Sequence, residues 1–381
     1  MENTLQVTLV GAGRYGQGLI GPKYSQGKFN PDAQLCSIVD TRSFNNNTRI
    51  KNTEFCPDIA EDLNKGYCLL HFFKYNNAKD WRKGLARIPN ENDVVEIALK
   101  PEIVPKVFKE FVQTGVTKFI LPKPVTTNLE ELNQMEQLTE QYKLQTAVTS
   151  NWHYSDITKF TKAIIDKIIG KSIDEQDNCC EELKQINKTY SIESAELNYV
   201  KNRGDISDTT PAKCELSYAL QILSSVGLVD MANDVPVVTQ ATPSSVTVQY
   251  NNDNVEKPIK VHTDIKLRAN TQTGRERLLK IYLNDGDPEP DIIADYDVCL
   301  DKKNEKFGSV KVDIGQGKDR VAWEKTIKED NLEIMYKKIF KTFKQPRTNS
   351  KTSNTVLTLH DYSFVAKQIS NIQNEWEMLN V

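Results

Sequence analysis

The chain has 381 residues, of which 38% are hydrophobic and 27% are charged, with a formal net charge of −3. This length is typical of two domains, and the composition is that of an ordinary globular protein. The charge gives no long-range attraction to nucleic acid or to an anionic membrane, and no apolar run approaches the roughly 18 residues of a membrane span. We therefore expect a cytoplasmic protein that binds neither nucleic acid nor a membrane.

The seven cysteines form no C-x-x-C pair, and no histidine lies at metal-ligand spacing from them. This pattern predicts reduced, mostly structural thiols and no metal site.

A glycine motif at residues 7–16, "VTLVGAGRYG", follows directly on an apolar run. Val7–Val10 is typical of a buried strand, and a helix that begins near Arg14 would direct its free backbone N–H groups at the turn. In a dinucleotide-binding turn, Gly11 would allow the tight turn, Gly13 would let a pyrophosphate approach, and Gly16 would let the helix pack on the strand. Chance, or close packing alone, also fits three glycines at this spacing.

The next strand favours nucleotide binding. In "AQLCSIVDTRS" the apolar run from Leu35 to Val39 is followed by Asp40. In dinucleotide-binding folds an acidic residue at this strand end accepts hydrogen bonds from the ribose hydroxyls. Arg42 could reach an adenine face or a 2′-phosphate. NAD and NADP therefore both remain open as the cofactor.

Strand-like and helix-like segments alternate over the first 150 residues, which predicts a parallel sheet with helices on its faces. "YCLLHFFKY" is either a strand or a buried helix. A strand is predicted over 94–99, followed by a helix that ends at Gly115. "TKFILPKPVTTNLEELNQMEQLTEQYK" predicts a strand, a turn and a helix with Thr127 and Glu130 as its capping box, and "LQTAVTSNW" predicts another strand.

Beyond about residue 190 the hydrophobic period changes from 3.6 to 2. "KPIKVHTDIKLR" alternates apolar and polar residues as a half-solvated antiparallel strand does, and the segments 277–285, 293–300 and 307–315 look like its neighbours. Helices are predicted over 216–227 and 361–379. Loops are predicted over 171–191 and 344–355.

Together these features resemble the Gfo/Idh/MocA family of glucose-fructose oxidoreductase and inositol dehydrogenase. The resemblance rests on the glycine turn, on Asp40, on "DVVEIALKPEIVPKVFKEFVQTGVTKFILPKPVTTNLEEL" and on the antiparallel sheet that follows. It implies an α/β fold with an N-terminal Rossmann doubly wound parallel sheet and a C-terminal α+β domain with an open, mainly antiparallel sheet. The expected domains are a Rossmann NAD(P)-binding domain over 1–150, a substrate and oligomerisation domain over 151–360, and a helix over 361–381 that packs back on the Rossmann domain. A homodimer or homotetramer is expected.

The resemblance also implies the site residues. Lys123, in "PKP", takes the place of the family's E-K-P lysine, although Pro122 replaces the glutamate. A partly buried ammonium at that place can donate or share a proton. The expected cofactor-binding residues are Gly11, Gly13, Arg14, Tyr15, Gly16, Asp40, Thr41, Arg42, Lys100, Pro101, Lys123 and Asn151.

The helix that carries an acid/base histidine in many members reads "PAKCELSYALQILSSVG" here and has no histidine. The catalytic candidates are therefore Lys123, His153, Glu215 and Tyr218. We expect an NAD(P)-dependent oxidoreductase that moves a hydride to or from a sugar, a cyclitol or a nucleotide sugar, or a C=N reductase similar to the thiazolinyl imine reductases. The alternative is a catalytically silent dinucleotide-binding regulator on the same fold.

Overall fold

In the computed structural model, the chain forms two compact units, and strand β1 (Leu5–Val10) belongs to the first of them. The first unit comprises Met1–Ser150 and Leu332–Ser363, and the second comprises Asn151–Asn331 and Phe364–Val381. The structure describes residues 4–11, 13, 16, 20–41, 71–74, 89–173, 180–201, 210, 215–253, 255–265, 275–285, 287–298, 307–328, 331–345 and 356–379. Within these ranges, no helix is long and apolar enough to cross a membrane.

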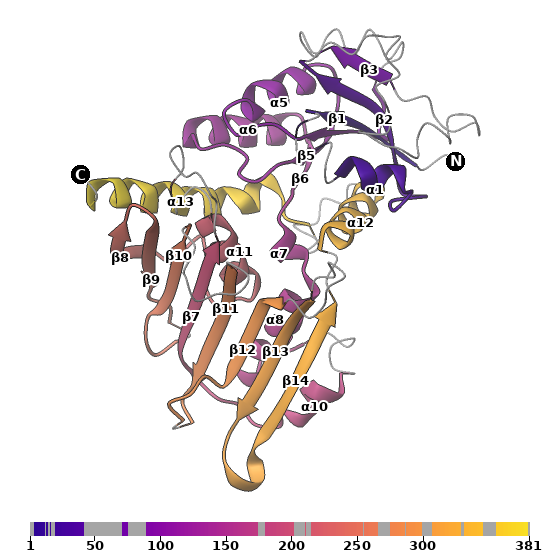
Figure 1. Cartoon of the computed structure of the whole chain (residues 1–381). Coiled ribbons are helices and arrows are strands. Elements are labelled where there is room, and N and C mark those ends of the chain that lie inside the picture. The colour runs from indigo at the N-terminus through magenta and orange to yellow at the C-terminus, as the bar shows by residue number, and fades with distance from the viewer. Residues whose placement is uncertain are drawn as a thin grey trace. The chain divides into compact units, whose positions relative to one another are not determined.

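The sheet of the first unit has six parallel strands in the order β3-β2-β1-β4-β5-β6. This is the doubly wound Rossmann order, which reverses direction between β1 and β4. The strands read as continuous apolar runs because helices cover both faces of a parallel sheet (Figure 1). The remaining elements of the unit are β2 (Ala33–Asp40), β3 (His71–Lys74), β4 (Asp93–Ile97), β5 (Lys118–Leu121), β6 (Gln145–Val148), α1 (Gly21–Ser25), α5 (Val104–Val112), α6 (Leu129–Gln141) and α12 (Asn331–Lys344).

Helix α12 was not predicted from the sequence, although it completes the core of the first unit from the far end of the chain. Its Tyr336 ring is tilted against Phe29 with ring centroids 5.3 Å apart, and its Phe340 ring packs edge-on against Phe29 with centroids 5.4 Å apart. The same helix faces a buried carboxylate of the sheet. Glu96 on β4 is 1% exposed and accepts hydrogen bonds from Tyr336 Oη and, at 3.0 Å, from Tyr24 Oη.

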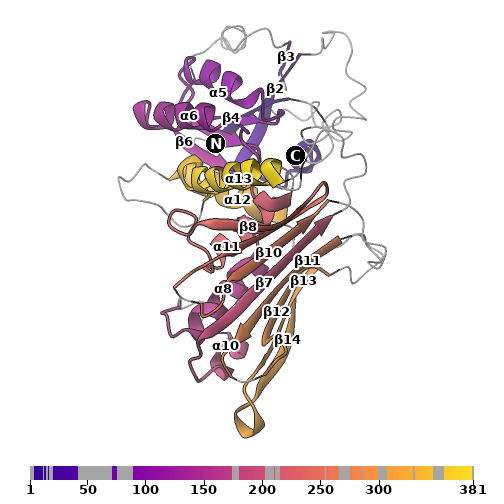
Figure 2. The ribbon, with the colours of Figure 1, turned by 90° about the vertical axis from the view of Figure 1, so that its left-hand side faces the viewer.

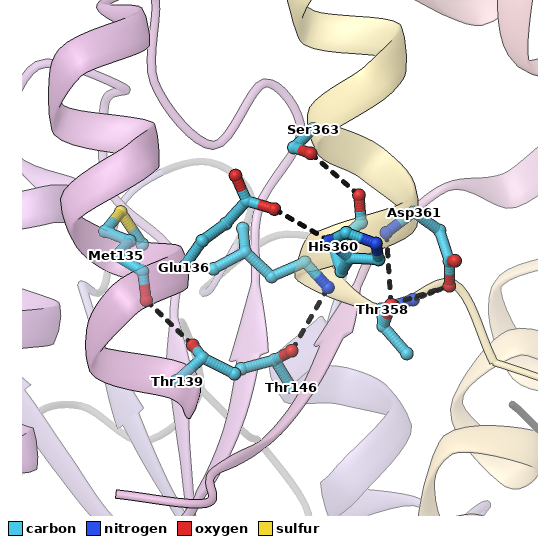
Figure 3. Close-up of polar contacts among 9 residues, drawn as sticks. Met135, Glu136, Thr139, Thr146, Thr358, His360, Asp361 and Ser363 are labelled. Atoms are coloured by element: carbon cyan, nitrogen blue, oxygen red, sulfur yellow. Dashed lines mark hydrogen bonds and ion pairs between the residues drawn. The ribbon is translucent and has the colours of Figure 1, made fainter. Parts of the chain in front are cut away.

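Helix α13 (Leu359–Leu379) begins against β6 and α6 within the first unit (Figure 3). Thr358 and Asp361 form a reciprocal capping box, in which the Thr358 amide donates to Asp361 Oδ2 at 3.1 Å and the Asp361 amide donates to Thr358 Oγ1 at 3.2 Å. The Leu359 amide donates to Thr146 Oγ1 at 3.1 Å, and His360 Nδ1 lies 3.1 Å from Glu136 Oε1. These contacts fix where the helix starts.

The second unit has an eight-stranded sheet in the order β14-β13-β12-β11-β7-β10-β9-β8. All pairs are antiparallel except β7 with β10, so the predicted mainly antiparallel sheet is confirmed. In Figure 2, α8 and α10 lie on one side of this sheet. The elements are α7 (Asn151–Tyr154), α8 (Asp156–Ile168), α10 (Glu181–Gln185), α11 (Ser217–Ser225), β7 (Ile192–Lys201), β8 (Pro236–Thr242), β9 (Ser245–Tyr250), β10 (Ile259–Asp264), β11 (Arg275–Leu283), β12 (Ile292–Val298), β13 (Phe307–Ile314), the 3₁₀ turn η4 (Gly317–Asp319) and β14 (Val321–Lys328).

Two local expectations need correction, and the structure decides a third that was left open. The cap of α6 is Asn128 and not Thr127, because Asn128 Oδ1 accepts from the amides of Glu130 and Glu131 at 2.9 and 3.3 Å. The predicted loop over 171–191 contains the short helix α10. The described part of "YCLLHFFKY" at residues 71–74 is a strand and not a helix.

The C-terminal helix α13 is divided between the two units, and its predicted packing on the Rossmann domain stays a prediction. Only the first turn of α13 groups with the Rossmann unit, and Phe364 onward groups with the second unit. There, Gln368 Nε2 donates to the carbonyls of Met231 and Asp234 at 2.9 and 2.6 Å, and Trp376 Nε1 donates to the Thr242 carbonyl at 2.9 Å. The predicted roles of the domains and the predicted oligomer stay predictions.

Candidate functional site

The glycine turn follows β1 at the carboxyl end of the strand. Gly11 has φ +101°, a conformation that L side chains rarely adopt. Its amide donates to the Val39 carbonyl at 2.8 Å, and a Cβ added to it would lie 2.5 Å from the Ala98 oxygen. Strands β1, β2 and β4 therefore close around this residue, which leaves room only for glycine.

The other two glycines have different steric surroundings. A Cβ on Gly16 would lie 2.3 Å from the Gly11 oxygen, whereas a Cβ on Gly13 would meet nothing within 4 Å. Gly13 is exposed, and Gly16 is buried. The turn thus has one glycine for the bend, one beside open space and one for close packing, which are the three roles in a dinucleotide-binding turn. This arrangement fits a pyrophosphate at Gly13.

We expect Gly16→Ala to destabilise the first unit by about 1–3 kcal/mol, because the new methyl group must displace the backbone of Gly11. Gly13→Ala is the matched control, since its methyl group enters open space. Thermal unfolding of the two variants measures the difference. Equal melting temperatures would show that Gly16 has no packing role.

Lys100 and Pro101 follow β4, beside the point where the strand order reverses and where ligands bind in open α/β sheets. The Lys100 carbonyl accepts from the amides of Ile103 and Val104 at 3.0 and 3.3 Å, at the start of α5. Lys100 is exposed and Pro101 is half-buried. The backbone here is fixed by the helix, and the lysine side chain points to solvent.

Asp40 ends β2 and is half-buried, and the neighbouring Thr41 is exposed. This is the strand-end position that the sequence predicted for the acidic residue. Arg14, Tyr15 and Arg42 lie outside the described residues, as does the predicted start of the first helix.

Lys123 lies two residues after β5, and Ser150 lies two residues after the neighbouring strand β6. Lys123 Nζ is 3.5 Å from Ser150 Oγ. The serine is completely buried, and the lysine is half-buried. Because parallel strands end at the same edge of a sheet, the ammonium is held at the carboxyl edge that also carries the glycine turn. Ser150 was not among the residues predicted from the sequence.

Asn151 and His153 belong to α7, in the second unit. Both side chains are half-buried. His153 Nδ1 lies 3.3 Å from Ser225 Oγ at the end of α11, and Gln221 Nε2 donates to the same hydroxyl at 3.4 Å. The imidazole is thus tied to α11 through Ser225.

Glu215 precedes α11 and is completely buried, whereas a glutamate at a helix start is usually solvated. It is close enough to act electrostatically on Tyr199, whose ring stacks on Tyr218 with centroids 6.0 Å apart. Burial raises the pKa of Tyr199 far above its usual value, so this phenol stays neutral. The structure therefore brings Glu215 and Tyr218 together around Tyr199.

Two further residues complete this group. Trp152 Nε1 donates to Tyr199 Oη at 2.9 Å, and the Arg277 guanidinium lies 5.1 Å from the Tyr199 ring and 5.4 Å from the Trp152 ring. Sequence reasoning missed Tyr199 and Arg277, because each occupies an ordinary position in an alternating strand. Only their pairing across β7 and β11 reveals the group.

No protein-family model matches the chain, and no curated protein matches its sequence. Solved structures match it over nearly the full length. UDP-N-acetylglucosamine 3-dehydrogenase GnnA from Acidithiobacillus ferrooxidans is 14% identical, with a TM-score of 0.58 and 98% of each chain covered. The WlbA dehydrogenase from Thermus thermophilus, in complex with NAD and UDP-GlcNAcA, is 12% identical, with a TM-score of 0.59 and coverage of 96% of this chain and 94% of the other.

An oxidoreductase from Agrobacterium radiobacter, in complex with NAD+, L-tartaric acid and magnesium, is 11% identical, with a TM-score of 0.63 and coverage of 98% of this chain and 96% of the other. At these identities the likeness shows the fold. The resemblance to Gfo/Idh/MocA-type oxidoreductases that the motifs indicated is therefore confirmed for the fold.

Proposed function

We propose, from the premise that this chain has the fold of Gfo/Idh/MocA-type oxidoreductases, that it is an NAD(P)-dependent oxidoreductase acting on a sugar or a nucleotide sugar. The observation that carries the proposal is the glycine turn, where Gly11, Gly13 and Gly16 each have the steric surroundings that a dinucleotide requires. The substrate class follows the neighbours, of which one is a UDP-N-acetylglucosamine dehydrogenase and another holds UDP-GlcNAcA beside NAD.

In this proposal the first unit binds the dinucleotide. Gly11, Gly13 and Gly16 hold the pyrophosphate, and Asp40 accepts hydrogen bonds from the ribose hydroxyls. When bound, the nicotinamide supplies or accepts the hydride. A carboxylate at Asp40 favours NAD, because it repels a 2′-phosphate.

Lys123 is the proposed proton carrier at the reacting oxygen of the substrate. Lys123 is half-buried, and the buried Ser150 hydroxyl lies 3.5 Å from its Nζ. A positioned acid of this kind contributes about 10²–10⁴-fold to a rate.

Glu215 is the proposed proton partner in the second unit. Its carboxyl group has no contact with bulk water, and it is close enough to act electrostatically on Tyr199, whose ring stacks on Tyr218. His153 is the second candidate, because its Nδ1 is held by Ser225.

Titration of the purified protein with NADH and NADPH, followed by nicotinamide fluorescence, tests the binding step. We expect micromolar binding by the wild type and none by Gly13→Val. A Cβ at Gly13 meets nothing within 4 Å, so we expect the fold to stay intact while the approach of the pyrophosphate is blocked. An unchanged melting temperature of the variant is the control. Equal binding by both proteins would contradict a pyrophosphate site at Gly13.

Turnover tests the chemistry separately. Sugars and nucleotide sugars are offered with NAD+ or NADP+, and cyclic imines are offered with NADPH. Reduction of an imine alone would move the assignment to a C=N reductase. Dinucleotide binding without turnover of any compound would favour the silent regulator.

A further inference from the structure

The turn between β11 and β12 in the second unit is strongly acidic. Residues 284–291 read "NDGDPEPD", with carboxylates at alternate positions Asp285, Asp287, Glu289 and Asp291. Such a run is normally a solvated loop, and the run alone indicates no ligand. The burial of its last member sets it apart.

Asp291 is only 2% exposed. Its amide donates to the Ile281 carbonyl at 3.0 Å, its carbonyl accepts from the Asp313 amide at 2.8 Å, and its Oδ2 accepts from the Leu283 amide at 2.7 Å. Its Oδ1 is buried, and no donor among the described residues reaches it. A buried carboxylate oxygen without a donor is costly, because it has lost its water without a replacement.

The side chain that Asp291 does face is another carboxylate. Asp285 contacts it and acts on it with a like charge. Asp285 is itself held in place, since its Oδ1 accepts from the Asp287 amide at 2.9 Å and its Oδ2 accepts from the Gly315 amide at 3.0 Å. Backbone bonds thus hold two carboxylates together against their repulsion.

Two basic residues of the second unit, Arg320 and Lys188, pair with other carboxylates. Arg320 forms a bidentate pair with Asp313, with both N–O distances 2.7 Å, and Lys188 pairs with Asp319. Neither neutralises the pair of Asp285 and Asp291. Among the described residues, Asp291 Oδ1 therefore has no hydrogen-bond donor to offset its loss of water.

We propose that Asp285 and Asp291 bind a hard divalent cation of the Ca²⁺ type. In the part of the chain that the structure describes, no three His, Cys, Asp or Glu side chains are placed to hold one ion. A site of two carboxylates therefore takes its other ligands from backbone oxygens and water, which Ca²⁺ accepts in a flexible shell of six to eight oxygens. Zn²⁺ prefers closed sites of cysteine and histidine, so it does not fit.

Calorimetric titration with CaCl2 tests the proposal on the full chain after dialysis against EDTA. Burial and the neighbouring Asp285 raise the pKa of Asp291 to about 7, so the titration is made at pH 8 to avoid competition by protons. We expect a dissociation constant of about 10⁻⁴–10⁻³ M, typical of sites with few carboxylates. Asp291→Asn should bind at least about tenfold more weakly, because it removes one of the two charges.

The melting temperature gives a second readout. In EDTA, Asp291→Asn should melt no lower than the wild type, because asparagine still accepts from the Leu283 amide and no longer repels Asp285. In CaCl2, only the wild type should rise, at matched ionic strength.

Asp319→Asn is the matched control, since it neutralises an exposed aspartate that is paired with Lys188. It should bind Ca²⁺ like the wild type. No binding by the wild type at pH 8 would overturn the proposal and leave the pair sharing a proton. Unchanged Ca²⁺ affinity in Asp291→Asn would also overturn it.

Discussion

Lys123→Met is expected to lower kcat by about 10²–10⁴-fold, the contribution of a positioned general acid. The methionine keeps the length of the side chain and removes the ammonium that lies 3.5 Å from Ser150 Oγ. The affinity for NADH or NADPH should stay within about threefold, because the pyrophosphate is held by the glycine turn and not by this ammonium. Turnover of the best substrate of the panel and fluorescence titration measure the two quantities on the same preparation.

Two further variants separate chemistry from structure at Lys123. Lys106→Met on α5 is the control, since Lys106 is an exposed lysine of the same unit, and it should leave kcat unchanged. Ser150→Ala should shift the pH profile of kcat without abolishing turnover, because it loosens the ammonium without removing it. Turnover by Lys123→Met equal to the wild type would remove Lys123 from the proton-transfer step.

The same assay on Glu215→Gln and His153→Gln decides which residue is the proton partner. A loss in Glu215→Gln comparable to that in Lys123→Met, with His153→Gln near wild type, is the result expected from the burial of Glu215. The reverse order would assign the role to His153.

Glu96→Gln is expected to stabilise the first unit above pH 7. Burial raises the pKa of Glu96 from 4.5 to about 7, although the hydrogen bonds from Tyr336 and Tyr24 act in the opposite direction. A carboxyl group with a raised pKa in the folded state stabilises the fold below pH 4.5, and this contribution is lost as the pH rises through 7. At about 1.4 kcal/mol for each pH unit in this window, the wild type should lose about 3 kcal/mol between pH 4.5 and 7.

The glutamine cannot ionise, so the stability of the variant should change less over this window. Calorimetric unfolding at pH 5 and pH 8 measures the difference, and the advantage of the variant should appear at pH 8 only. Glu140→Gln, at an exposed glutamate of α6, is the control and should show no such difference. Equal stability of the wild type at pH 5 and pH 8 would contradict the prediction, because it would show that Glu96 does not change its protonation state in the folded protein between these pH values.

Local patterns in the sequence determined much of the first unit. The apolar run before Gly11, the strand that ends at Asp40 and the segment that leads to Lys123 are each recognisable within about ten residues, because strand burial and glycine conformation depend on near neighbours. The alternation over 259–267 likewise predicted an antiparallel strand. The order of these segments along the chain predicted a parallel sheet followed by an antiparallel sheet, and the family resemblance identified the first as a Rossmann sheet.

The tertiary structure alone decided the contacts between distant segments. Tyr336 reaches Glu96 across 240 residues, and Ser150 meets Lys123 because β5 and β6 end at the same edge. Burial of Glu215 and of Asp291 reverses the solvated character that their local sequence predicts. Periodicity shows which face of an element is apolar, but it does not show which element will cover that face. The covering element determines which charged groups lose their water, and those groups carry the chemistry proposed for this protein.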